Sequence, residues 1–579
     1  MNSSELPERS SAAGSWLWQD YAVTLLLSLA TAAVVVWQNS RLGILWDLSY
    51  ILEYAYRMSL GEVPYRDFPF PHTPLTFLMQ AALIKLTGRV FLHHVLYCAV
   101  MGGLATVLTW RILLNLLGGV VASARLAAFL LSMPLTVLGI YCIFPHPFYD
   151  PDCTFAILLC LFLLQQLESK GFPPLRAFLT GAALVVPLFV KQNVGLAFLG
   201  STGLALVTLM GLEAWRRQPV VGYAWLMAGV VAGLAAALLL IQFTAGLANY
   251  QHWTFQFAMS RRLPPLADML SIYNDDRLPW WIIAMFLAGA LLWRLNRQGR
   301  RVLALFAAAL MSAPFVWPLV SLFTAEDPLE PGDQLLALWP FLLIVSSGVA
   351  LWRLWSERQR LGMALALPFI LISTVHGAFL SQQVWGSTYG LWPLLMLLVA
   401  STILMVSRRE WSAWGMVPFA AVLAVSMLVA GGHYVWKHER LDYAKLSQGA
   451  MARSTLPALT GLSIRGPWIP DFEELVSFAE RKIPRQDGLL MIPGEDLFYY
   501  TTGRHPQFPV MLFDHTTNPY PPAEILKLSR ARGIRWLVVK RHLQLEDEPV
   551  EDKAQLLALL RRDFTLVTRL KNYDVYRRR

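Results

Sequence analysis

The segment GILWDLSYILEYAYRMSLGEVPYRDFPFPHTPLTF, residues 43–77, decides how the rest of the sequence is interpreted. It combines acidic, basic and aromatic side chains, yet it directly follows a strongly apolar run at 21–38. An apolar run of about 18 residues with few charges is typical of a membrane-spanning helix. The segment therefore predicts a charged loop that begins where a membrane span ends.

Similar apolar runs recur along the chain. Of its 579 residues, 56% are hydrophobic and 15% are charged, whereas an average soluble domain has about 25% charged residues. This composition predicts an all-α polytopic membrane domain rather than a large soluble core. We predict about thirteen membrane-crossing helices, at 21–38, 91–116, 120–143, 152–168, 174–190, 193–214, 220–243, 278–294, 301–323, 334–354, 361–380, 388–407 and 412–435.

The loops between these runs alternate in charge. One set is basic and faces the cytoplasm by the positive-inside rule; the acidic segments FYDPD, IYNDDR and TAEDPLEPGD then face outward. The net charge of +10 is explained by the basic loops, and no nucleic-acid motif is present. We predict a multi-pass inner-membrane protein with a cytoplasmic tail at 1–20. The basic set is Arg111, Arg125, Lys170, Arg176, Arg216, Arg217, Arg294, Arg297, Arg300, Arg301, Arg353, Arg358, Arg360, Arg408 and Arg409.

The chain changes character after the membrane domain at 21–438. Within 439–579 the apolar runs shrink to strand length, and helical patterns intervene at 471–482, 522–532 and 551–561. Short strands that alternate with helices predict a small α/β domain, which the loop charges place outside the cytoplasm. The predicted strands are GLLMI, FPVMLF, RWLVVK, DFTLVTRL and YDVYR, with the last two joined as a hairpin by KN.

The first outer loop, about 39–90, has its own predicted structure. Residues 47–60 have helical spacing with an aromatic face, which favours a helix along the membrane interface. The apolar stretch at 74–87 is too short to cross a bilayer and is expected to be re-entrant or interfacial. Asp47 stands at the start of the first helix, where it is either an N-cap or a general base at the membrane surface.

Specific motifs in this loop resemble a known family. The arrangement D-x-x-Y, L-G-x-x-P-Y-R-D-F, P-H-T-P-L and K-L-T-G resembles the first outer loop of the GT-C superfamily of membrane glycosyltransferases. The most similar branch is the bacterial one related to protein mannosyltransferases and aminoarabinose transferases. The resemblance implies a polyprenyl-phosphate sugar donor and gives Asp47 the role of catalytic base. Many members have an acidic pair here, whereas this chain has Trp46 followed by the single acid Asp47.

Two further motifs resemble the same branch. FPHPFYDPDCTFAILL matches its second acidic loop, which implies catalytic roles for Asp150 and Asp152; the alternative is a helix start with Asp150 as N-cap. GAALVVPLFVKQNVGL matches its Lys-Gln pattern at a helix end, which implies that Lys191 binds the donor phosphate. The alternative for Lys191 is a snorkelling anchor at the membrane interface.

The proposed chemistry needs a base and cations. A carboxylate takes the proton of the acceptor hydroxyl, and cations stabilise the leaving phosphate. A divalent cation, Mg or Mn, is compatible with the three aspartates, but the spacing requires no metal. The phosphate-binding candidates are Lys191, Arg66, Arg261 and Arg262, and the substrate-lining candidates are Tyr50, Tyr65, His72 and Gln192. Anchoring to lipid headgroups is the alternative role for the cations, and packing is the alternative for His72.

The sequence therefore predicts a membrane glycosyltransferase that acts on the outer face of the cytoplasmic membrane. Its acceptor is a lipid, a polysaccharide or a protein. Two other functions stay open at this point: a transporter or flippase of a lipid-linked substrate, and a non-catalytic subunit of envelope assembly. Many transporters have internal repeats, which this sequence lacks.

Overall fold

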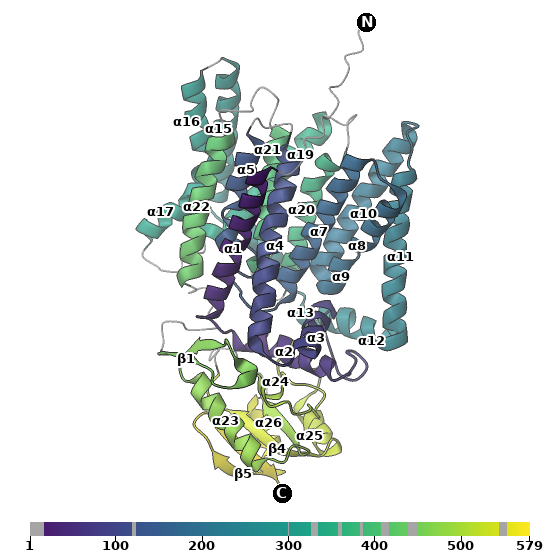
Figure 1. Ribbon diagram of the computed structural model, residues 1–579, viewed down its shortest axis with the longest axis vertical. Helices are drawn as coiled ribbons and strands as arrows, with labels where there is room; N and C mark the ends of the chain where they lie inside the picture. The colour runs from purple at the N-terminus through teal and green to yellow at the C-terminus, as the bar shows by residue number, and fades with distance from the viewer. Residues whose placement is uncertain are drawn as a thin grey trace.

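The computed structural model describes residues 17–118, 123–298, 300–325, 334–356, 362–381, 386–406, 416–437, 449–543 and 553–579. Its helices form an elongated bundle, and a small α/β region lies at one end of that bundle (Figure 1). The predicted tail residues 1–16, the acidic residues 326–333 and four of the predicted basic residues lie outside the described residues. These four are Arg358, Arg360, Arg408 and Arg409.

Seven helices among the described residues are long and apolar enough to cross a membrane. An eighth span results if the bent pair α16 (Arg301–Met311) and α17 (Ala313–Thr324) is counted as one, with 63° between its two parts. The seven are α1 (Trp18–Asn39), α4 (Phe91–Leu117), α7 (Tyr149–Lys170), α10 (Gln192–Trp215), α11 (Val221–Thr244), α19 (Leu338–Ser356) and α22 (Met416–Lys437).

The other predicted spans coincide with helices that are shorter, interrupted or, in the case of α15, counted as apolar only over Leu278–Leu291. Proline explains two of the interruptions, because it lacks the N–H that continues a helix: Pro134 precedes α6, and Pro187 lies at the start of α9. The count of thirteen crossings stays a prediction. These helices are α5 (Ala124–Ser132), α6 (Leu135–Leu138), α8 (Pro174–Ala183), α9 (Val186–Val190), α15 (Leu278–Arg297), α20 (Met363–Phe379) and α21 (Trp392–Val406).

The two ends of the bundle differ in charge. The ends of α4, α7, α10 and α15 and the starts of α5, α8, α11 and α16 lie at the end of the bundle away from the α/β region (Figure 1). Basic residues lie within or beside these helix ends: Arg111, Arg125, Lys170, Arg176, Arg216, Arg217, Arg294 and Arg300. The start of α1 lies at this basic end, where Arg125 pairs with Asp20 at 3.3 Å. The first and last described segments of the chain thus lie at opposite ends of the bundle.

Two helices of the first outer loop lie across the other end of the bundle. α2 (Leu45–Ser59) is buried over most of its length, and α3 (Leu75–Thr87) packs against it and ends at Gly88. Gly88 has a φ of 83°, a left-handed conformation that glycine adopts without strain. The sequence bounds of these two helices agree with the predicted ranges. Protein covers α2 on both of its faces.

A series of short elements follows α11 on the same end of the bundle. They are α12 (Leu247–Gln251), the π-helix η1 (His252–Phe257), α13 (Ala258–Arg262), α14 (Leu266–Leu270) and the 3₁₀ helix η2 (Ser271–Tyr273). A second 3₁₀ helix, η3 (Gly386–Gly390), precedes α21. None of these elements was predicted, since each is too short for a periodic pattern.

The α/β region contains a four-stranded mixed sheet in the order β3-β4-β6-β5. β3 pairs in parallel with β4, and β6 pairs antiparallel with both β4 and β5; Lys571 and Asn572 join β5 to β6 as predicted. The strands are β3 (Gly488–Ile492), β4 (Ile534–Lys540), β5 (Phe564–Arg569) and β6 (Tyr573–Arg578), and the helices are α23 (Trp468–Lys482), α24 (Phe498–Thr502), α25 (Pro522–Ala531) and α26 (Lys553–Leu560). An unpredicted antiparallel pair, β1 (Met451–Arg453) and β2 (Ser463–Arg465), and the 3₁₀ helix η5 (Pro457–Leu459) come before them.

The predicted strand FPVMLF, residues 508–513, is wrong. The segment is buried but joins no sheet. Pro509 has no N–H to give to a ladder, and the carbonyl oxygens of Phe508 and Pro509 accept hydrogen bonds from Arg57 Nη1 at 3.0 and 2.9 Å. The segment therefore contacts α2 instead of a neighbouring strand.

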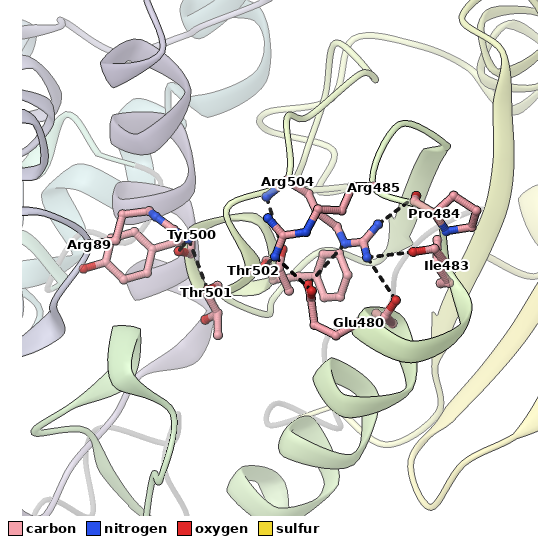
Figure 2. Close-up of polar contacts among 11 residues, drawn as sticks. Arg89, Glu480, Ile483, Pro484, Arg485, Tyr500, Thr501, Thr502 and Arg504 are labelled. Carbon is pink, nitrogen blue, oxygen red and sulfur yellow. Dashed lines mark hydrogen bonds and ion pairs between the residues drawn. The ribbon is translucent and has the colours of Figure 1, made fainter.

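The polar face of α2 holds the α/β region against the bundle. Ser49, Glu53 and Arg57 are four residues apart and lie on one face; they bond to Gly494, Tyr500 and Phe508, respectively. Arg89 adds two hydrogen bonds, to the carbonyl oxygens of Tyr500 at 2.7 Å and Thr501 at 3.1 Å (Figure 2). The polar face of α2 is thus an internal connection between the two parts of the chain.

Candidate active site

A buried ion pair joins Lys191 to Asp150. Lys191 lies at the break between α9 and α10, in an extended conformation with φ −147° and ψ 115°. Asp150 lies in the first turn of α7, and the two side chains are only 7% and 5% exposed. Burial of a single charge is costly, and the pairing offsets that cost. The pair therefore fixes a lysine at the end of the bundle that carries the α/β region.

Tyr149 connects this pair to two further side chains. Lys191 Nζ lies 5.3 Å from the centre of the Tyr149 ring, and the His72 ring stacks on Tyr149 at 4.7 Å between centroids. Arg262, at the end of α13, donates from Nη1 to His72 Nε2 at 2.5 Å. We call Lys191, Asp150, Tyr149, His72 and Arg262 the Lys191 cluster. Four separate segments meet in it.

His72 is neutral in this cluster. Burial, and then the positive charges of Arg262 and Lys191, hold the pKa of His72 well below its usual range. The hydrogen bond requires the same state, because Nε2 accepts from a guanidinium and needs a free lone pair. The two cations of the cluster are thus separated by a neutral ring.

The aromatic wall beside the cluster comes from α2 and the loop that follows it. The Tyr50 hydroxyl is buried and has no hydrogen-bond partner among the described residues, and its ring lies 5.2 Å from that of His72. Tyr65 donates to the His72 carbonyl at 2.6 Å, and Gln192 donates to the Pro71 carbonyl at 3.1 Å. The predicted lining residues Tyr50, Tyr65, His72 and Gln192 therefore lie together.

Asp47 lies near the cluster and is partly exposed. It occupies the first turn of α2, and the N-cap of that helix is Ile44, so the capping role considered from the sequence is wrong. Its carboxylate acts electrostatically on the Tyr149 hydroxyl, as does that of Asp150. The N-cap of α7 is Phe148, so the capping role considered as the alternative for Asp150 is wrong as well. In both cases the helix begins earlier than the acidic residue.

Asp152 points to a different set of partners. Tyr97 and Tyr141 each donate to its Oδ1 at 2.7 Å, and Thr76 donates to its Oδ2 at 2.8 Å. These three hydroxyls come from α4, the loop after α6, and α3. Asp152 therefore joins the spans to the first outer loop.

Two predicted phosphate-binding residues lie outside the Lys191 cluster. The Arg66 side chain is 52% exposed and pairs with Asp67 at 2.9 Å. Arg261 is exposed, with its guanidinium 5.8 Å from the Phe257 ring centre. Within the described part of the chain, no three or more His, Cys, Asp or Glu side chains form a group able to hold a metal ion. A Mg or Mn requirement stays a prediction.

Sequence reasoning missed Tyr149, which contacts Lys191 and His72. The only available signal was its position directly before Asp150 in FYDPD. An aromatic residue at the end of a span is ordinary in a membrane protein, so this position did not stand out.

No protein-family model matches the chain, and no curated protein matches it. Solved structures similar to it include ArnT from Cupriavidus metallidurans bound to undecaprenyl phosphate, at 14% identity, with 96% of this chain and 97% of that chain covered and a TM-score of 0.45. The apo state of the same ArnT is similar at 15% identity, with 98% of each chain covered and a TM-score of 0.45.

Proposed function

We propose that this chain is a membrane glycosyltransferase. It moves a sugar from a polyprenyl-phosphate donor to an acceptor at the outer face of the cytoplasmic membrane. The observation that carries the proposal is the Lys191 cluster, which combines two cations and a neutral histidine at the end of the bundle covered by α2 and α3. We infer a polyprenyl-phosphate sugar as donor because the first outer loop resembles that of the GT-C superfamily.

The cations suit the leaving group. When the bond between the anomeric carbon and the phosphate oxygen breaks, the lipid phosphate takes the electron pair and gains negative charge. Lys191 is a point charge and Arg262 offers two parallel N–H donors, so the two complement each other in phosphate binding. Both lie in or next to a buried, aromatic environment, where electrostatic stabilisation is stronger than in water.

Asp47 is the carboxylate best suited to act as base. Asp150 is ion-paired with Lys191, and Asp152 accepts three hydroxyl hydrogen bonds. Asp47 is partly exposed at the start of α2. In the proposed step the acceptor oxygen attacks the anomeric carbon, its proton passes to Asp47, and the polyprenyl phosphate departs. Asp150 acts as a positioning residue for Lys191.

The segregation of charge supports the orientation. The helix ends that have basic residues lie at the end of the bundle opposite the α/β region (Figure 1), and basic residues next to membrane spans favour the cytoplasm. The start of α1 then faces the cytoplasm, and residues 439–579 face outward as a separate domain. A lipid-borne donor in the outer leaflet reaches the Lys191 cluster at the membrane surface.

The test uses purified full-length protein and polyprenyl-phosphate sugars labelled in the sugar. The reaction is supplied in turn with envelope lipids, polysaccharide or peptides as acceptor, and the release of free polyprenyl phosphate is measured. A glycosyltransferase releases it together with a labelled product. Movement of intact donor across vesicles without release would favour a flippase, and neither activity would favour an assembly subunit.

A further inference from the structure

A second site lies between the first outer loop and the α/β region. It is an open surface hollow of about 550 Å³. It lies apart from the Lys191 cluster and shares no residue with it. Its lining residues are Arg57, Glu62, Arg66, Asp67, His505, Pro506, Gln507 and Arg532.

The hollow has an excess of positive charge. Its two carboxylates are already paired, Glu62 with Arg57 at 2.5 Å and with His505 at 3.3 Å, and Asp67 with Arg66 at 2.9 Å. Arg532 has no carboxylate partner among the described residues. The hollow thus contains three arginines and two carboxylates. The guanidinium of Arg532 is left to bind an anion from outside the chain.

One wall of the hollow is held rigid. The Arg57 side chain is 3% exposed. It donates to the carbonyl oxygens of Phe508 and Pro509, and its guanidinium lies 4.5 Å from the Phe68 ring centre. These contacts within the chain hold Arg57 and residues 508–509 in place. A preformed wall of this kind lowers the ordering cost of binding.

One lining residue of the hollow, Arg66, lies beside the end of the predicted membrane span α11. Arg66 Nη1 donates to the carbonyl oxygen of Thr244 at 3.4 Å, and Thr244 is the last residue of the span α11. In the last turns of that helix, Leu240 and Phe243 are 65% and 83% exposed, as expected for side chains that contact acyl chains. Arg66 is thus located where the hydrocarbon region ends and the phosphate layer begins.

We propose that this hollow binds the anionic headgroup of a bilayer phospholipid. The lipid phosphate pairs with Arg532 and accepts a further hydrogen bond from Arg66, which stays paired with Asp67, and the acyl chains lie along α11. A lipid in this position bridges the first outer loop and the α/β region. The proposal does not depend on the proposed enzymatic activity, since its site and ligand are different.

The test is native mass spectrometry of the detergent-purified full chain with phosphatidylglycerol, phosphatidylcholine or inorganic phosphate. We expect one equivalent of phosphatidylglycerol to bind more tightly than the zwitterionic lipid. Arg66→Gln and Arg532→Gln each remove one cation and are each expected to weaken this binding about fivefold, the typical effect of one basic residue near an anionic lipid surface. Arg532→Lys keeps the charge and is expected to retain binding.

Arg562→Gln is the matched control, because Arg562 is also an exposed arginine of the α/β region and does not line the hollow. Its binding of phosphatidylglycerol is expected to equal that of the unaltered protein. Equal binding of the two lipids, or equal losses in Arg562→Gln and Arg532→Gln, would overturn the proposal. Competition by inorganic phosphate at the same concentration as the lipid would show a site for free anions and would overturn the lipid assignment.

Discussion

Lys191 and Asp150 form a buried ion pair that connects the break between α9 and α10 to the first turn of α7. The two residues are 41 positions apart in the sequence. The pair gives Lys191 a fixed place beside Tyr149, and Tyr149 in turn stacks on His72. The electrostatics of the candidate active site therefore depend on a contact that also stabilises the bundle.

Asp150→Asn tests this double role. It leaves Lys191 buried without its counter-charge, so we expect a loss of about 3–5 kcal/mol in stability and a lower unfolding temperature in detergent. The double variant Asp150→Asn with Lys191→Met removes both charges and is expected to recover much of the stability without recovering polyprenyl-phosphate release. An unchanged unfolding temperature for Asp150→Asn would contradict the account.

Asp152 is expected to act in stability rather than in turnover. Tyr97→Phe and Tyr141→Phe each remove a hydrogen bond to its carboxylate, at about 1.5–3 kcal/mol for a bond to a charged group. The unfolding temperature should fall in both variants, while the release rate per folded molecule stays the same. Tyr56→Phe is the control, because no hydrogen bond of that hydroxyl is present in the described structure and the ring keeps its contact with Arg89. A fall in release rate at unchanged stability would give Asp152 a catalytic role instead.

Glu53 is expected to make the stability of the docked α/β region depend on pH. Its carboxylate accepts the Tyr500 N–H at 3.2 Å, and burial raises the pKa of Glu53 well above its usual value of 4.5. The folded protein therefore holds this proton more tightly than the unfolded chain does. The resulting stabilisation is complete below pH 4.5 and is lost as the pH rises through the raised pKa.

Glu53→Gln removes this titration while keeping a side-chain oxygen for Tyr500. The variant is therefore expected to gain stability relative to the unaltered protein as the pH increases. Unfolding temperatures of both proteins at pH 5 and pH 8 measure the difference. A difference that is the same at the two pH values would rule out the raised pKa as its source.

Arg504 is expected to stabilise the end of α23. Its guanidinium donates to the carbonyl oxygens of Ala479, Ile483 and Pro484 at 2.9, 2.8 and 3.0 Å (Figure 2). Arg504→Lys cannot reach all three, and unpaired buried carbonyls cost about 1–3 kcal/mol each. We expect faster amide hydrogen exchange at the end of α23 in this variant. Arg485→Lys, at an exposed arginine paired with Glu480, should exchange like the unaltered protein.

The sequence predicted the features that depend on local patterns. The apolar runs, the two helices of the first outer loop, the strands β3 to β6 and the final hairpin all have a periodicity or composition of their own. The polar face of α2 is an example of a feature that local patterns predict only in part. Periodicity identifies Ser49, Glu53 and Arg57 as one face, but it does not distinguish water from a polar protein partner.

The site depended on contacts that are distant in the sequence. Lys191, His72 and Arg262 were named individually, yet nothing in their spacing indicates that they meet around Tyr149. Arg66 and Arg261 are arginines like Arg262, but their side chains lie outside the Lys191 cluster. The helix starts were misplaced because Ile44 and Phe148, which have no capping side chain, are the N-caps of α2 and α7.

The most direct test of the proposed function compares Asp47→Asn with the unaltered protein in a single-turnover assay with labelled polyprenyl-phosphate sugar and an active acceptor. We predict that the variant folds and binds the donor with unchanged affinity but releases polyprenyl phosphate at least about a hundredfold more slowly, the usual minimum for the loss of a general base. Release at the normal rate by Asp47→Asn would contradict the account.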